Sequence, residues 1–288
     1  MKQLFTLVLI LSLNPVFLGA QSKEGFNLPP ADSLSKWQKE LGIPALGIAT
    51  IEQGKINRQI VQGELTPGKA APYNAIFDVA SITKSMLTYL TMQLVSQGQW
   101  DLDEPLYPYW VDPDVKDDPR HKKLTSRIVL SHQTGFKNWR FMNEDKKLAF
   151  DFEPGTKFGY SGEGFVYLQR ALEKKFEQPL EQLLQEQLFD PYSMKDSHLI
   201  WTDRVDVSRQ ALGHNASAEP YEYTKIREAS AADDMLTTVG DLARFSQKVL
   251  MQADVKPAVF AEMSKTQIEV KEGMGFGLGW VVFPDLPG

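Results

Sequence analysis

Apolar positions near the N-terminus repeat at spacings that predict a helix followed by paired strands. From residue 32 to residue 41 they fall three and four positions apart, which predicts a short helix with one buried face. The apolar run at 45–51, the turn residues at 52–55 and a weakly alternating stretch at 56–61 then predict a β-hairpin.

The middle of the chain carries mainly helical patterns. A helix is predicted to begin near Ser81, with an apolar stripe and with Gly98 placed to end it, and residues 163–176 repeat the same spacing. Pro179 then restarts a helix, at a position where proline is tolerated. Residues 101–123 are rich in Pro and Asp and are expected to form a loop.

Strand patterns return near the C-terminus. Thr238 and Asp241 are spaced as a capping box at the start of one more helix, and residues 273–283 pass from alternating glycines into a strand. Two short strand regions cannot bury both faces of a sheet unless they come together. We therefore predict one α/β (α+β) body, with an antiparallel sheet built from both chain ends and a large helical insertion between them.

Residues 1–20 have the pattern of an export signal. Lys2 supplies a positive charge, residues 4–13 form an almost uncharged apolar run, and small residues end the segment before Gln21. A run this short predicts a removable signal peptide, with an uncleaved anchor as the alternative. No later stretch is apolar enough to cross a bilayer, so residues 21–288 are expected to form a single exported domain, periplasmic or secreted, of a bacterial type.

Composition and charge narrow the possible functions. The sequence has no cysteine, which excludes disulfides, thiol catalysis and thiolate metal sites. Its 31 basic and 37 acidic side chains give a net charge of −6 without a long basic run, which disfavours nucleic acid as a partner. The four histidines are far apart in the sequence, so no zinc or iron site is predicted and no cofactor is implied. The expected partner is a small-molecule or peptide substrate, and the oligomeric state is left open.

Ser81 and Lys84 are the first candidates for chemistry. They lie three residues apart at the start of a predicted helix, so their side chains share one face and can meet. The helix N-terminus adds backbone N–H groups suited to an oxyanion. A serine needs a neighbouring base, and a desolvated lysine can lose its proton to become one. Taken alone, the pattern also fits a helix-capping serine beside a solvated lysine.

The context of Ser81 resembles the serine β-lactamase and penicillin-binding-protein family, of the class C β-lactamase and D,D-peptidase type. Its motifs follow one another in the family's order from about residue 37 to residue 283. The first three are the nucleophile segment at 77–86, a stretch at 130–136 similar to the Ser-His-Thr-Ser-Gly loop, and a Tyr-x-Asn-like motif at 158–162. A glycine- or alanine-rich turn then leads into a Thr-Thr-x-x-Asp-Leu helix at 231–245. The last is a strand entry at 275–280 similar to Gly-Tyr-Gly-Leu-Gly-Trp. The resemblance implies a β-lactamase/transpeptidase-like fold.

The resemblance also implies roles for residues at matching positions. Ser81 would form the acyl-enzyme, Lys84 would help to take its proton, and Tyr160 would relay protons to the leaving group and from the deacylating water. The alternative for Tyr160 is a buried aromatic with a satisfied hydroxyl. His132 suggests a Ser-His-Asp triad, but the family places this histidine in a structural loop. We expect a buried, hydrogen-bonded side chain there.

Two departures from the family pattern bear on function. Gly162, at a substrate-binding position, replaces the asparagine whose amide contacts the acyl side chain of lactams, and esterase-like relatives also depart at this position. The family's Lys- or His-x-Gly triplet is expected beyond Trp280 and does not occur before Gly288. That strand normally supplies the second oxyanion donor, and losing one donor typically costs about 10²–10³ in rate. We therefore expect the sequence to be a family member truncated at its C-terminus.

The leading hypothesis is an exported serine hydrolase that acts by acyl transfer on an amide, β-lactam or ester in the cell envelope. D,D-peptidase, β-lactamase and esterase activities are not separated by the sequence. A non-catalytic penicillin-binding or sensor-like protein that retains the scaffold is the alternative. The missing triplet favours it, and the intact Ser81, Lys84 and Tyr160 oppose it. A third possibility is a truncated chain that folds poorly.

Overall fold

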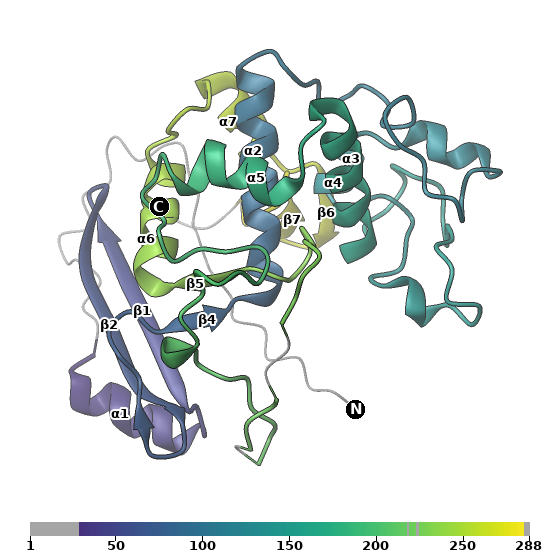
Figure 1. Ribbon diagram of the computed structural model, residues 1–288. Helices are drawn as coiled ribbons and strands as arrows, with labels where there is room; N and C mark the ends of the chain where they lie inside the picture. Colours follow the sequence, from purple (N-terminus) through teal and green to yellow (C-terminus); the bar gives the residue numbers. More distant parts are fainter. Residues whose placement is uncertain (1–28, 218, 223–224, 285–288) are drawn as a thin grey trace.

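The structure is a computed structural model that describes residues 29–217, 219–222 and 225–284 (Figure 1). The predicted signal peptide at 1–20 lies outside the described residues. The helices and strands, in chain order, are α1 (Ala31–Glu40), β1 (Ala45–Glu52), β2 (Lys55–Thr66), β3 (Lys69–Ala70), β4 (Ile76–Asp78), α2 (Thr83–Ser96), α3 (Ser126–Leu130), α4 (Gly162–Phe176), α5 (Leu180–Leu184), β5 (Leu236–Thr238), α6 (Val239–Leu250), α7 (Pro257–Ser264), β6 (Ile268–Lys271), β7 (Met274–Phe276) and β8 (Val281–Val282).

The N-terminal helix and hairpin form as predicted. β1 and β2 pair antiparallel, with Ile48 opposite Ile60. Gln53 and Gly54 make the turn between them, and their φ angles of 50° and 73° are in the left-handed region that favours glycine. Helix α6 packs against both strands. A Cβ on Gly47 would lie 2.6 Å from the Val239 side chain, so the glycine permits this close approach.

Helix α2 is buried on every side and lies at the centre of the molecule (Figure 1). Of its 14 residues only Val95 is not buried, and the helix contacts α4, α5 and α7. The buried hydroxyls of Thr88 and Thr91 donate to backbone carbonyls one turn earlier, at 2.9 and 2.8 Å, so neither lacks a partner. A helix buried all round is a core helix, and this one begins directly after the turn that holds Ser81.

The mixed α/β class is confirmed, but the strands near the two chain ends do not share a sheet. Within the described ranges the strands form three separate sheets, β1–β2–β3, β4–β5 and β6–β7–β8. Helix α6 covers the first hairpin. The connection from β7 to β8 packs closely on α2, where a Cβ on Gly279 would lie 2.1 Å from the Thr88 hydroxyl. The expected sheet joining strands from both chain ends is not among the sheets of the described ranges.

The helices predicted in the middle region are confirmed. Helix α4 begins at Gly162, one residue before the predicted start, and α5 follows Pro179 and continues as a π-helical turn at Gln185–Phe189. The expected loop at 101–123 is irregular apart from a 3₁₀ turn at Pro119–Lys123.

The predicted capping box at the start of α6 is only half formed. Thr238 Oγ1 accepts a hydrogen bond from Asp241 N at 3.1 Å, as a helix cap does. The Asp241 carboxylate instead accepts from Asp196 N and Ser197 Oγ, at 2.8 and 3.0 Å. It therefore ties α6 to a distant loop.

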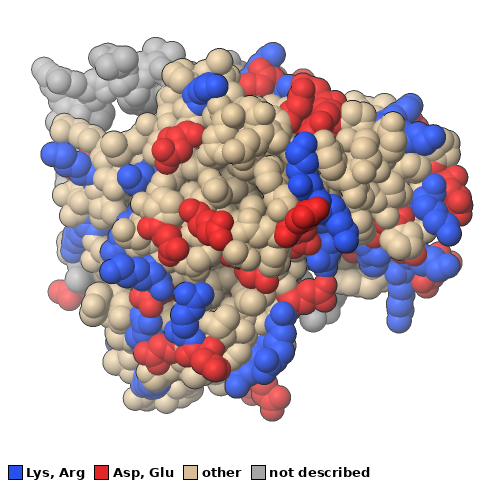
Figure 2. Space-filling view, turned by 45° about the horizontal axis from the view of Figure 1, so that its top comes forward, with Lys and Arg blue, Asp and Glu red and all other residues tan. Residues whose placement is uncertain are grey.

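The surface carries charges of both signs. Basic and acidic side chains are interspersed over the face shown in Figure 2. None of the helices in the described ranges is long and apolar enough to span a membrane.

Candidate active site

Ser81 lies at the junction between β4 and α2. Strand β4 ends at Asp78, whose Oδ1 accepts a hydrogen bond from Ala80 N at 2.9 Å. Ala80 has a φ of 43°, a left-handed conformation that is uncommon for residues other than glycine. A single 3₁₀ turn, Ala80–Ile82, then leads into the helix. This geometry leaves Ser81 exposed at the N-terminal end of the buried helix α2.

Lys84 points at Ser81 from the first turn of α2. Its Nζ donates to Ser81 Oγ at 3.2 Å and to the backbone carbonyl of Ala232 at 2.7 Å. The side chain is buried, and burial lowers the pKa of Lys84 to about 8, with the charge of Asp233 acting in the opposite direction. A fraction of the amine is therefore neutral near pH 7, and a neutral amine can accept the Ser81 proton.

Tyr160 completes the group that the motifs predicted. Lys84 Nζ lies 5.0 Å from the centroid of the Tyr160 ring. Burial raises the pKa of the Tyr160 phenol, and a hydrogen bond with Ser81 partly offsets that rise. Ser81, Lys84 and Tyr160 are thus brought together from two elements far apart in the sequence. Their catalytic roles stay a prediction.

His132 is buried and hydrogen-bonded, as expected. Only 1% of its surface is exposed, and its Nδ1 accepts from Ser161 N at 3.1 Å. Its ring lies 4.3 Å from the Tyr160 ring, centroid to centroid. Burial, together with the charge of Lys84, lowers the pKa of His132 to about 3, so this histidine is neutral at physiological pH. It supports the segment that carries Tyr160.

Gly162 is the first residue of α4, two residues beyond Tyr160. Its N–H donates to Asn138 Oδ1 at 2.8 Å. A Cβ at this position would lie 2.9 Å from the nearest indole carbon of Trp139. Trp139 therefore occupies the space that the family's asparagine side chain would enter.

The turn at 229–234 contains residues that contact the candidate site and that the sequence did not indicate. Its Ala232 carbonyl holds Lys84, and its conformation is fixed by Gln169, a fully buried residue of α4. Gln169 Nε2 donates to Ala229 O at 2.9 Å, and Gln169 Oε1 accepts from Ala231 N at 2.8 Å. The amide of Gln169 therefore sets the position of the carbonyl that orients Lys84.

Two adjacent carboxylates follow Ala232. The Asp233 carboxylate accepts from Ser230 Oγ at 2.8 Å, and its charge raises the pKa values of both Lys84 and Tyr160. Burial, together with the charges of Asp233 and Asp78, raises the pKa of Asp234 to about 7. In the sequence, the one feature that could have drawn attention to this turn is the pair Asp233 and Asp234, because the family's turn is otherwise rich in glycine or alanine.

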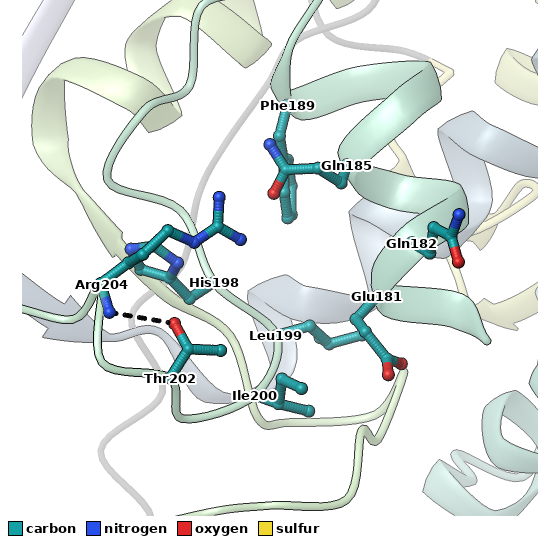
Figure 3. Close-up of a pocket in the computed structure, with 9 residues that line it drawn as sticks. All are labelled: Glu181, Gln182, Gln185, Phe189, His198, Leu199, Ile200, Thr202 and Arg204. Carbon is teal, nitrogen blue, oxygen red and sulfur yellow. Dashed lines mark hydrogen bonds between the residues drawn. The ribbon is translucent and has the colours of Figure 1, made fainter.

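A pocket of about 200 Å³ lies elsewhere in the molecule (Figure 3). Side chains from α5 and the following π-helical turn, including Gln185 and Phe189, face His198 and Arg204 across it. None of Ser81, Lys84 and Tyr160 lines this pocket. In the described ranges no group of three or more His, Asp or Glu side chains could hold a metal ion.

Comparison with known sequences points to one family. The family described as Beta-lactamase matches residues 32–287. The chain is 26% identical over 255 residues to the D-alanyl-D-alanine-carboxypeptidase/endopeptidase AmpH of Escherichia coli (strain K12), covering 76% of this chain and 64% of that protein. It is 25% identical over 221 residues to the lovastatin esterase of Penicillium rubens, covering 59% of this chain and 55% of that protein. The chain therefore spans less than two thirds of the length of these relatives.

Comparison with solved structures identifies proteins with a similar fold. The octameric penicillin-binding protein homologue from Pyrococcus abyssi has a TM-score of 0.75 at 20% identity, covering 88% of this chain and 64% of that chain. A likeness at this level of identity shows the fold, and it confirms the β-lactamase/transpeptidase-like fold that the motifs implied.

Proposed function

The chain belongs to the β-lactamase family, and on that basis we propose that it is an exported serine hydrolase whose Ser81 forms an acyl-enzyme with an amide, β-lactam or ester. The observation that carries the proposal is the contact between Lys84 Nζ and Ser81 Oγ at 3.2 Å, with the pKa of Lys84 lowered to about 8. A lysine in this state is a general base placed within hydrogen-bond reach of its nucleophile.

The first step is attack on the substrate carbonyl. Lys84 in its neutral form takes the Ser81 proton as Oγ bonds to the carbonyl carbon. Backbone N–H groups of the 3₁₀ turn before α2, among them that of Ser81, stabilise the developing oxyanion. The tetrahedral intermediate then collapses to the acyl-enzyme when the leaving group departs.

Tyr160 serves the leaving group. Because burial raises its pKa, the phenol is protonated at neutral pH and can give its proton to the departing oxygen or nitrogen. The protonated Lys84, whose Nζ is 5.0 Å from the Tyr160 ring centroid, then returns a proton to the phenolate. In deacylation a water molecule attacks the ester, and the same two groups carry its proton to Ser81 Oγ.

The proposed substrates are acyl compounds, that is, amides, β-lactams or esters. The named relatives include a peptidase and an esterase, so their shared step is acyl transfer. The chain spans 64% of the AmpH sequence, and the proposal concerns that step. Export rests on the sequence pattern of residues 1–20.

The test is to expose the full chain to a penicillin and to 4-nitrophenyl acetate and to follow its intact mass, with Ser81→Ala as the control. An adduct that forms on the parent, decays with time and is missing from the variant supports the proposal. An adduct that persists indicates a binding or sensor protein. A folded parent that forms no adduct with either compound contradicts the proposal.

A further inference from the structure

The loop at 137–140 is held tightly against the N-terminus of α4. Ser161 Oγ donates to Lys137 O at 3.0 Å, and Asn138 accepts from Gly162 N through its side chain and from Glu163 N through its carbonyl, at 2.8 and 3.1 Å. These contacts fix both the start of the helix and the backbone that precedes Trp139.

Arg140 secures the other side of Trp139. Its guanidinium pairs with the buried carboxylates of Glu163 and Asp112, both at 2.8 Å. With hydrogen bonds before it and ion pairs after it, the Trp139 backbone has little freedom. Its indole is held in place over Gly162.

Trp139 and Phe141 form an aromatic surface beside the candidate active site. Their rings are stacked, with centroids 6.3 Å apart and planes 13° apart. Trp139 is half-buried against the core, whereas Phe141 is 66% exposed. Tyr160, which is 39% exposed, lies two residues before Gly162 in the chain. The indole thus lies next to the segment that brings Tyr160 to Ser81.

The indole and an asparagine at position 162 exclude each other. An added Cβ would meet three indole carbons at 2.9 to 3.1 Å, before any amide is built. The chain therefore places an indole where an asparagine at position 162 would extend its amide. Aromatic faces bind flat apolar groups through offset stacking and burial of area.

We infer that Trp139 and Phe141 are specificity-determining residues that bind a flat, apolar acyl group of the substrate. This inference rests on the proposed acyl transfer to Ser81 and names the acyl half of the substrate. The preferred substrates are esters or amides of aromatic acids, and small acyl groups such as acetyl make no use of the surface.

The experiment compares two esters with the same leaving group, 4-nitrophenyl phenylacetate and 4-nitrophenyl acetate. In Trp139→Ala, kcat/KM for the phenylacetyl ester is expected to fall about tenfold to a hundredfold, mainly through KM, while the acetyl ester changes by less than about threefold. Trp139→Phe retains most of the preference because it keeps an aromatic face. Trp37→Ala, which alters a half-exposed tryptophan of α1, is the matched control and is expected to leave the ratio unchanged.

Two further measurements keep the inference independent of folding and of catalysis. If Trp139→Ala fails to unfold cooperatively, Phe141→Ala replaces it, since an exposed ring can be removed without disturbing the core. In the Ser81→Ala chain, binding of N-methylphenylacetamide followed by NMR is expected to weaken at least about tenfold when Trp139 is also replaced, whether or not the parent is acylated. An unchanged ester ratio, an equal loss for both esters, or unchanged probe binding overturns the inference. Failure of both esters to acylate Ser81 overturns the proposed function instead.

Discussion

The rate at which Ser81 is acylated should rise with pH through the titration of Lys84. Burial lowers the pKa of Lys84 from 10.5 to about 8, which corresponds to a cost of about 3 kcal/mol for holding the charged amine at this site rather than in water. About one tenth of the molecules then carry a neutral Lys84 near pH 7, and about nine tenths near pH 9. Because the neutral amine is the base, acylation is expected to become about tenfold faster over that interval.

Initial rates of 4-nitrophenyl acetate hydrolysis from about pH 6 to about pH 10 measure this dependence. Ser81→Ala gives the background to subtract at each pH. A rate that does not change with pH, or one that rises only near the pKa of a lysine in water, would refute the assignment of Lys84 as a desolvated base.

Replacement of Asp233 by Asn should shift the same profile in a defined direction. The charge of Asp233 raises the pKa of Lys84, so its removal lowers that pKa and moves the midpoint to lower pH. The asparagine keeps an oxygen that can accept from Ser230 Oγ, so the turn is retained. Asp32→Asn, in α1, is the control for the change in net charge. A midpoint that moves to higher pH in Asp233→Asn would contradict the electrostatic argument.

Three further predictions concern the surroundings of the site. Gln169→Leu leaves the buried Ala229 carbonyl and Ala231 N–H unpaired, so urea unfolding should show a loss of about 1–3 kcal/mol, and acylation should slow because the carbonyl that orients Lys84 is released. Thr238→Ala removes the cap of α6 and should cost about 1 kcal/mol in the same assay, with Thr202→Ala, at a half-buried loop position, as the comparison. The pKa of Asp234 in the folded chain is about 7, above its value of 3.8 in water, so its contribution to stability is complete below about pH 4 and is lost as pH rises through 7. The melting temperature should therefore fall between about pH 5 and about pH 8, and it should fall by less in Asp234→Asn.

Local patterns predicted the parts of the site that depend on local geometry. The three-residue spacing of Ser81 and Lys84 on one helix is sufficient for their contact, and helical periodicity placed α2 and α4 correctly. The approach of Tyr160 to Ser81 could be expected only from the family resemblance, because the two residues are far apart in the sequence. The sheet expected to join strands from both chain ends is not found among the described strands, since the choice of partner for each strand depends on long-range packing.

The contacts that were missed all cross long stretches of chain. In the sequence, Gln169 is indistinguishable from the other polar residues of an amphipathic helix. In the structure, its amide is hydrogen-bonded to a turn some sixty residues later. Asp233 acquires its influence from its distance to Lys84, which no local spacing encodes. The importance of Trp139 likewise comes from its packing on Gly162. The sequence shows a glycine at that position but does not show which side chain packs against it.

The burial of α2 on all sides has a consequence for how such a protein changes during evolution. A substitution at almost any position of this helix has to satisfy neighbours in every direction, so the reactive pair at its start is inherited as one unit with the core. Innovation in substrate range is then confined to segments that approach the nucleophile from other elements and have solvent on one side, such as the loop that carries Trp139 and Phe141. The pair proposed to carry the chemistry is constrained by the same packing that keeps the protein folded, whereas the loop that carries Trp139 and Phe141 is free to diverge.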